Sequence, residues 1–334
     1  MTAPLAPNPA VGGGRKSERL EFADNALLIQ LFGSHHAHLA RIEQQLDVSL
    51  HANGNEVNIV GPPDQVAAAR AVLDGLYERL RRGLSVGPAE VKAAVRMAVR
   101  GGREEIAGTH IIRTRNRQIT PRSATQLAYV NAIEARDLVF GLGPAGTGKT
   151  YLAVAKAVEK LVNGEVDRII LSRPAVEAGE QLGFLPGDMR EKVDPYLRPL
   201  YDALHDMLPP QQVAKRLENG DIEIAPLAFM RGRTLSNAFV ILDEAQNTTP
   251  IQMKMFLTRL GENARMVVAG DLSQIDLPGG ARSGLRDSVD VVRDLAGVAV
   301  ITFSDQDVVR HPLVTGIVRA YERMEREANP VREQ

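Results

Sequence analysis

The chain has 334 residues, of which 44% are hydrophobic, enough for about two domains with buried cores. It carries 40 Lys and Arg against 41 Asp and Glu, and a net charge of −1 excludes a protein that coats nucleic acid through its overall charge. Cysteine is absent, which excludes disulfides and thiolate metal sites, and no apolar run reaches the about 18 residues of a membrane helix. We therefore expect a cytoplasmic protein without a membrane segment.

The N-terminal part of the chain predicts a disordered tail and then a small α+β domain. Residues 1–18 form the tail, which opens on a stretch rich in Pro, Ala and Gly, and residues 19–84 form the domain. Its predicted order is helix, helix, strand, strand, helix, with a possible first strand at 19–22. The helices are at 25–32, 38–46 and 62–82, and the strands at 48–51 and 56–60 flank an Asn53-Gly54 turn.

This order resembles the KH fold, in which a G-x-x-G loop between the first two helices clamps single-stranded nucleic acid. The corresponding loop reads Gly33-Ser34-His35-His36 and lacks the second glycine. Two interpretations stay open: the domain grips RNA, or it positions a partner or a neighbouring subunit.

Residues 85–120 predict a basic linker made of a helix at 88–100 and a hairpin through 111–119. Between Lys92 and Arg122, eight basic residues stand against only two acidic ones, Glu104 and Glu105. The basic residues are Lys92, Arg96, Arg100, Arg103, Arg113, Arg115, Arg117 and Arg122. Such a patch indicates either contact with nucleic acid or a solvated surface.

From residue 121 to 327, apolar strand-like runs alternate with helical segments. The runs lie at 138–140, 168–171, 222–225, 239–242, 266–269 and 298–303. This alternation predicts an α/β domain with a mainly parallel sheet and helices on both faces. Residues 177–208 predict an insertion, with Pro195 separating two helices, that contacts either nucleic acid or another subunit. Residues 328–334 form a C-terminal tail.

A complete phosphate-binding loop follows the first run of this domain and precedes a helix at 149–162. It reads Gly143-Pro144-Ala145-Gly146-Thr147-Gly148-Lys149-Thr150. The glycines let backbone N–H groups face the phosphates, Lys149 reaches the β and γ phosphates, and the Thr150 hydroxyl ligates Mg2+. The helix N-terminus favours the same anion. The loop therefore predicts binding of a nucleoside triphosphate.

An acidic pair ends the apolar run at 239–242. Ligands of open α/β sheets bind at the carboxyl ends of strands, so Asp243 and Glu244 are expected beside the loop. Asp243 would hold Mg2+ together with Thr150, and Glu244 would activate the attacking water. The pair predicts hydrolysis rather than binding alone.

Two glutamines are candidate contacts to the nucleotide. Gln274 follows the run at 266–269 and would sense the γ-phosphate, with Asp271 as a supporting group. Gln126 precedes the phosphate loop at a spacing typical of helicase-like proteins, and its amide offers the donor and the acceptor that adenine requires. With no Asn-Lys-x-Asp guanine-reading motif, this favours ATP over GTP.

Transfer of a γ-phosphoryl group benefits from an arginine. One nucleotide-binding core is predicted, so either Arg310 folds back within the chain, or Arg231 or Arg233 comes from an adjacent subunit of a ring. The alternative for each of these arginines is a solvated surface position with no role in phosphoryl transfer.

These residues together resemble the PhoH-like ATPase family. The resemblance extends through Ser172-Arg173-Pro174-Ala175-Val176-Glu177, Leu182-Gly183-Phe184-Leu185-Pro186-Gly187, Lys192-Val193-Asp194-Pro195-Tyr196-Leu197-Arg198-Pro199, Leu242-Asp243-Glu244-Ala245-Gln246-Asn247 and Gln252-Met253-Lys254-Met255-Phe256-Leu257-Thr258-Arg259. It implies a RecA-like ATPase related to the first motor domain of superfamily 1 helicases. It also implies a cytoplasmic homo-oligomeric ring, expected to be a hexamer, with ATP and Mg2+ as cofactors, a role in RNA metabolism, and a YbeY-type endoribonuclease as partner.

Two functions follow as alternatives. The first is an RNA-remodelling or helicase-like ATPase that holds single-stranded or structured RNA. The second is an ATP-dependent switch or assembly factor that acts on a ribonuclease or ribosomal partner without unwinding. A small-molecule kinase is less well supported, because Glu244 beside Asp243 suits activation of water.

Overall fold

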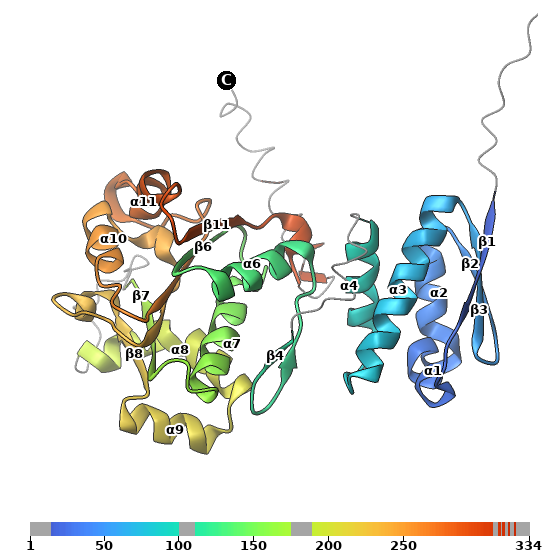
Figure 1. Ribbon diagram of the computed structural model, residues 1–334. Coiled ribbons are helices and arrows are strands. Elements are labelled where there is room, and N and C mark those ends of the chain that lie inside the picture. Colours follow the sequence, from blue (N-terminus) through green and yellow to red (C-terminus); the bar gives the residue numbers. More distant parts are fainter. Residues whose placement is uncertain are drawn as a thin grey trace, which may run out of the picture. The chain divides into compact units, whose positions relative to one another are not determined.

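The computed structural model describes residues 15–99, 111–174 and 189–309, with a few positions between 313 and 324. The chain divides into two compact units, each described by itself: Met1–Thr109 with Arg122–Ala124, and His110–Pro121 with Thr125–Gln334. Figure 1 labels most of their elements. Among the described helices, none is both long enough and apolar enough to cross a bilayer.

The first unit packs helices against a three-stranded antiparallel sheet of order β1-β3-β2. Its elements are β1 (Lys16–Glu21), α1 (Asn25–Phe32), α2 (Ala37–Leu46), β2 (Ser49–Asn53), β3 (Glu56–Gly61), α3 (Pro63–Arg81) and α4 (Pro88–Val99). This order agrees with the predicted one, and α3 begins with Pro63 in its first turn. The hairpin turn falls on Gly54-Asn55, one residue later than predicted, because Asn53 pairs with Glu56 and Gly54 takes the positive φ of 61°. Membership in the KH fold stays a prediction.

The predicted linker is divided between the two units. Val91, Ala94 and Val95 of α4 are buried in the core of the first unit, so this helix is part of that unit. The short hairpin of β4 (Ile112–Arg113) and β5 (Gln118–Ile119) buries its two isoleucines in a core of the second unit. An apolar face on each element explains why neither stands alone as a connector. The predicted end of the helix at Arg100, and Arg103, lie outside the described residues.

The second unit is built on a six-stranded parallel sheet of order β11-β6-β10-β9-β7-β8. The strands are β6 (Leu138–Leu142), β7 (Arg168–Arg173), β8 (Ile222–Pro226), β9 (Ala238–Leu242), β10 (Arg265–Gly270) and β11 (Val298–Thr302). Each coincides with a predicted run to within two residues. The helices are α6 (Ala124–Ala135), α7 (Lys149–Val162), α8 (Met189–Met207), α9 (Pro210–Asn219), α10 (Pro250–Leu257) and α11 (Gly284–Val292).

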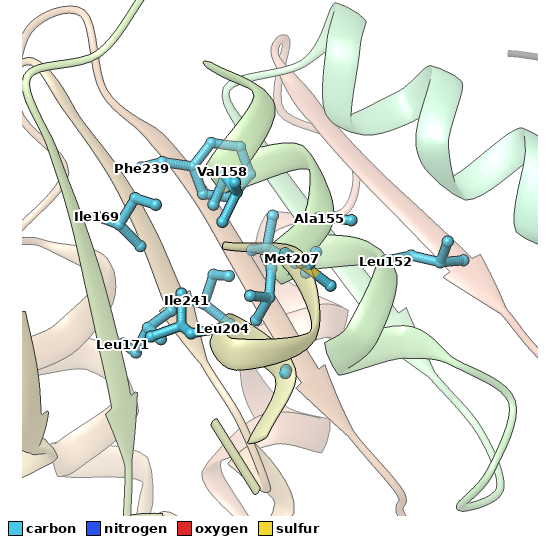
Figure 2. Packing of buried hydrophobic residues seen from close by; sticks show 14 of the residues in the cluster. Leu152, Ala155, Val158, Ile169, Leu171, Leu204, Met207, Phe239 and Ile241 are labelled. Atoms are coloured by element: carbon cyan, nitrogen blue, oxygen red, sulfur yellow. The ribbon is translucent and has the colours of Figure 1, made fainter. Parts of the chain in front are cut away.

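Both faces of this sheet are covered, which confirms the predicted α/β class. Successive residues of β9 point to opposite faces: Phe239 and Ile241 join one core cluster, and Val240 and Leu242 join another. The first cluster lies under α7 and α8, and Figure 2 shows Phe239 and Ile241 beside residues of both helices. The second lies under α10 and α11. Strands buried on both faces are typical of parallel sheets.

One predicted break is wrong. The helix α8 is continuous through Pro195, which was expected to separate two helices. A proline usually interrupts a helix because it lacks the N–H group. Here Leu197, Leu200, Leu204 and Met207 recur at helical spacing and are all buried against α7 and the sheet, so packing outweighs the lost hydrogen bond. Residues 177–188, the rest of the predicted insertion, lie outside the described residues.

Candidate nucleotide-binding site

The site lies where the carboxyl ends of four parallel strands meet. Leu142 pairs with Gly270, and Leu242 pairs with Val268 on one side and Ser172 on the other, so the loops that follow these strands start at one edge. A cavity of about 240 Å³ opens there. It is lined by Ala145, Gly146, Gly148, Lys149, Thr150, Tyr151, Asp243, Glu244, Gly270, Asp271 and Gln274. The structure therefore brings the phosphate loop, the acidic pair and Gln274 together, as the sequence predicted.

The phosphate loop has the backbone conformation that its glycines permit. Gly143, Gly146 and Gly148 have φ values of +134°, +81° and +85°, and α7 starts at the next residue, Lys149. The Lys149 ammonium lies within the loop, where it donates to the carbonyls of Gly143 (2.6 Å) and Pro144 (2.8 Å). A positive side chain and a helix N-terminus thus act at one point, which is the electrostatic requirement for binding phosphate.

The oxygens expected to hold a magnesium ion lie side by side. The Thr150 hydroxyl donates to Asp243 Oδ1 at 2.5 Å, and Asp243 is only 6% exposed. Burial raises the pKa of Asp243, and the hydrogen bond from Thr150 opposes that rise. A cation beside this carboxylate would favour its charged form.

The rest of the cavity also fits a hydrated magnesium ion. Asp271 Oδ2 is buried with no hydrogen-bond partner in the part of the chain that the structure describes, and Asp271 lines the same cavity. Within that part there is no cluster of three or more His, Cys, Asp or Glu side chains suited to a metal. Magnesium is usually bound by one or two protein oxygens together with water and substrate phosphates, so the residues fit this ion.

Glu244 combines a left-handed backbone with a carboxylate that has two side-chain partners. Its backbone is left-handed, with φ 51° and ψ 39°. Its carboxylate has two partners: Arg173 Nη2 at 3.0 Å on Oε1, and Gln246 Nε2, which donates to Oε2 at 2.6 Å. No role was expected for Arg173 or Gln246 from the sequence. Their positions could have suggested one, because Arg173 stands near the end of an apolar run and Gln246 is an amide two residues after Glu244.

The loop after β10 is folded around Asp271. Oδ1 of Asp271 accepts from the backbone N–H (3.0 Å) and the hydroxyl (2.6 Å) of Ser273, and the backbone N–H of Asp271 donates to Gln246 Oε1 at 3.0 Å. Gln274 is exposed and follows at the cavity wall, and its backbone N–H donates to the Asp271 carbonyl at 3.0 Å. Asp271 therefore supports the loop that carries Gln274. Sensing of the γ-phosphate by Gln274 stays a prediction.

Gln126 lies against the phosphate loop rather than at the cavity wall. Its Nε2 donates to the Thr147 carbonyl at 2.8 Å, and the residue is 4% exposed. This contact ties α6 to the loop. Recognition of adenine by Gln126 stays a prediction.

Of the three candidate arginines, the structure describes Arg231 and Arg233. Arg310 is outside the described residues. The residue before it, Val309, contacts the phosphate loop, because its backbone N–H donates to the Gly146 carbonyl at 3.0 Å. Both terminal nitrogens of Arg233 donate to Glu223, at 2.7 Å each, which raises the pKa of Arg233. Arg231 is exposed. Neither Arg231 nor Arg233 lines the cavity.

A parallel α/β sheet with a phosphate loop, a buried aspartate on the loop threonine and a neighbouring glutamate defines a phosphate-loop nucleoside-triphosphate-binding protein. The family model described as "PhoH-like protein" matches residues 118–322. The chain belongs to this family.

Relatives align with well over half of the chain at about 50% identity. The chain is 53% identical over 302 residues to the PhoH-like protein of Mycobacterium tuberculosis strain H37Rv, covering 90% of this chain and 86% of the other. It is 48% identical to the PhoH-like protein of Bacillus subtilis strain 168, covering 92% and 97%. Protein PhoH of Escherichia coli K12 is 51% identical over 205 residues, covering 61% and 58%. A solved SWI2/SNF2 ATPase core of Sulfolobus solfataricus in complex with dsDNA is 14% identical, covering 54% and 43%, and its TM-score of 0.32 does not establish a common fold.

Proposed function

We propose that this PhoH-like protein hydrolyses ATP. The observation that carries the proposal is the shared cavity of Lys149, the Thr150–Asp243 pair and Glu244. Thr150 and Asp243 would hold Mg2+, which supplies positive charge to the phosphate oxygens when it is bound. Lys149 and the loop N–H groups orient the β and γ phosphates.

Glu244 acts on the water. Its carboxylate takes a proton as the water oxygen bonds to the γ-phosphorus and the bond to the ADP oxygen breaks, which leaves ADP and inorganic phosphate. Gln274 at the cavity wall suits a contact to the γ-phosphate. The donor and acceptor of a glutamine amide suit the adenine edge, so Gln126 would favour ATP over GTP once its Nε2 leaves the Thr147 carbonyl to which it now donates.

We further propose that hydrolysis remodels single-stranded or structured RNA, with helicase-like action, in the cytoplasm. Arg113, Arg115 and Arg117 are exposed on the β4–β5 hairpin, where basic side chains suit phosphate contacts. The β1-α1-α2-β2-β3-α3 order of the first unit supports a KH-like RNA-binding role despite the incomplete G-x-x-G loop.

The alternative is a switch that acts on a YbeY-type endoribonuclease or a ribosomal partner without strand separation. Two facts favour it: a single phosphate-loop core lies within the described chain, and translocation usually needs two motor domains that move relative to each other. A hexameric ring would supply neighbouring cores and, from Arg231 or Arg233, an arginine between subunits, whereas Arg310 would act within its own chain.

ATP turnover with and without single-stranded RNA, measured beside strand separation, tests these proposals. We expect Lys149→Ala to abolish nucleotide binding and Glu244→Gln to retain binding while losing turnover. RNA-stimulated turnover with unwinding supports the remodeller. Turnover that ignores RNA but rises with a purified endoribonuclease supports the switch, and a persistent monomer in mass measurements with ATP would refute the ring.

A further inference from the structure

We propose that Arg173 restrains the catalytic glutamate: its ion pair holds Glu244 away from the phosphates, and loss of this pair speeds hydrolysis. The inference rests on the proposed function, because Glu244 acts on water only if the protein hydrolyses ATP. Arg173 is therefore a positioning residue that acts through Glu244.

The relative placement of two cavities gives the direction of the restraint. Beside the phosphate cavity lies a second one of about 790 Å³, which extends over α8 to Pro199, Asp202 and Asp206. Glu244 lines both cavities, whereas Arg173 lines only the second. Thr150 and Asp243 also line both cavities, so Arg173 marks the side of the second one. The ion pair of 3.0 Å therefore directs one carboxylate oxygen of Glu244 to the Arg173 side of the site, where the second cavity extends over α8.

Strand pairing keeps Arg173 at this point. The N–H of Asp243 donates to the Ser172 carbonyl at 2.9 Å, and Ser172 is paired in register with Leu242. Arg173 follows Ser172 and Glu244 follows Asp243, so this hydrogen bond between the two strand ends brings Arg173 and Glu244 within reach of each other. The backbone of Glu244 lies in the left-handed region. Its carboxylate is oriented by its two side-chain partners, Arg173 and Gln246.

The two contacts of the Glu244 carboxylate, with Gln246 and with Arg173, differ in how readily they break. Gln246 is 1% exposed, and its amide also accepts from the backbone N–H of Asp271, so it is fixed to the loop after β10. The side chains of Arg173 and Glu244 are 21% and 36% exposed, so solvent reaches their pair. An oxygen that already accepts from a guanidinium offers fewer lone pairs to the attacking water. Arg173 is thus the releasable contact and Gln246 the fixed one.

The test compares steady-state hydrolysis by full-length Arg173→Gln, Arg173→Lys and wild type. A partly exposed ion pair predicts that Arg173→Gln raises kcat about fivefold. KM for ATP should stay unchanged, because Arg173 does not line the phosphate cavity. Arg173→Lys keeps the charge and should stay near the wild-type rate.

Two controls separate this effect from a general one. Arg216→Gln removes an ion pair of similar exposure, with Asp221 at 3.4 Å, outside both cavities, and should leave kcat unchanged. Adding Glu244→Gln to Arg173→Gln should abolish the gain, which shows that the extra turnover passes through Glu244.

A kcat that stays the same or falls in Arg173→Gln, while wild type hydrolyses ATP in a Lys149-dependent way, overturns the restraint and leaves the proposed function intact. A raised KM with unchanged kcat also overturns it, because Arg173 would then bind nucleotide. If neither protein hydrolyses ATP, the proposed function and the restraint both fail.

Discussion

We predict that Gly143→Ala destabilises the second unit far more than an alanine at another glycine of positive φ. Gly143 has a φ of +134°, and a Cβ built there would lie 2.4 Å from the Phe303 carbonyl oxygen and 2.9 Å from Phe303 Cβ. Phe303 is 3% exposed and belongs to the core, so it has little room to move. The added methyl group must displace either the loop or the end of β11.

The expected cost has two parts. A side chain at an unfavourable positive φ costs about 1–3 kcal/mol, and forced overpacking costs about 1–3 kcal/mol more. Alanine also lowers the conformational entropy of the unfolded chain, which stabilises the folded state by about 0.5 kcal/mol. Gly143→Ala should therefore lower the free energy of unfolding by about 3 kcal/mol. Gly164 has a φ of +73° with nothing within 4 Å of its added Cβ, so Gly164→Ala should cost about 1 kcal/mol.

Urea unfolding followed by far-UV circular dichroism measures both variants, since the chain contains no tryptophan. Both glycines lie in the second unit, so the same transition is compared. Gly143→Ala should also weaken ATP binding, because the displaced segment carries the loop N–H groups. Equal losses of stability in the two variants would refute the reasoning, since they would mean that the close approach to Phe303 does not constrain the loop.

Three further predictions concern the second unit. Burial would raise the pKa of Glu134, but hydrogen bonds from Lys156 and Lys160 lower it from 4.5 to about 2. The contribution of Glu134 to stability is therefore present above pH 4.5 and lost as the pH falls toward 2. Across this range the urea midpoint should fall more steeply in wild type than in Glu134→Gln, and parallel curves would contradict this. Thr249→Ala removes the capping box of α10 and should cost about 1 kcal/mol in the same unfolding assay, whereas an unchanged midpoint would show that the cap contributes nothing. Gln126→Ala should raise KM for ATP about tenfold while changing KM for GTP less, as expected for the loss of one or two hydrogen bonds to adenine, and equal changes would assign Gln126 to the loop alone.

The strands of the second unit and its phosphate site could be predicted because both depend on local sequence. A run such as 239–242 is apolar throughout, so only burial on both faces of a sheet suits it, and the structure places all four residues in the core. The loop at 143–150 needs glycines at fixed positions, and its φ values show why. Asp243 and Glu244 could be placed beside it because parallel strands end at one edge.

What escaped prediction depends on contacts between segments far apart in the chain. Pro195 was expected to end a helix, but the leucines after it are buried under α7 and keep α8 continuous. The helix at 88–99 has basic residues that suggested a linker, yet Val91 and Val95 face the core of the first unit. Gln126 has a polar side chain suited to a ligand, and the structure shows it bonded to the loop carbonyl.

The same limit applies to the arginine that phosphoryl transfer calls for. The candidates from the sequence were Arg231, Arg233 and Arg310, because these arginines stand in loops or before a helix. Arg233 is held by Glu223, whereas Arg173 contacts Glu244 directly because β7 and β9 are neighbours in the sheet although they are distant in sequence. An arginine at the end of the adjacent strand can act on the glutamate that activates water without touching the phosphate. Under the proposed restraint a single core regulates its own hydrolysis, whether the arginine at the γ-phosphate is Arg310 of the same chain or Arg231 of a neighbouring subunit.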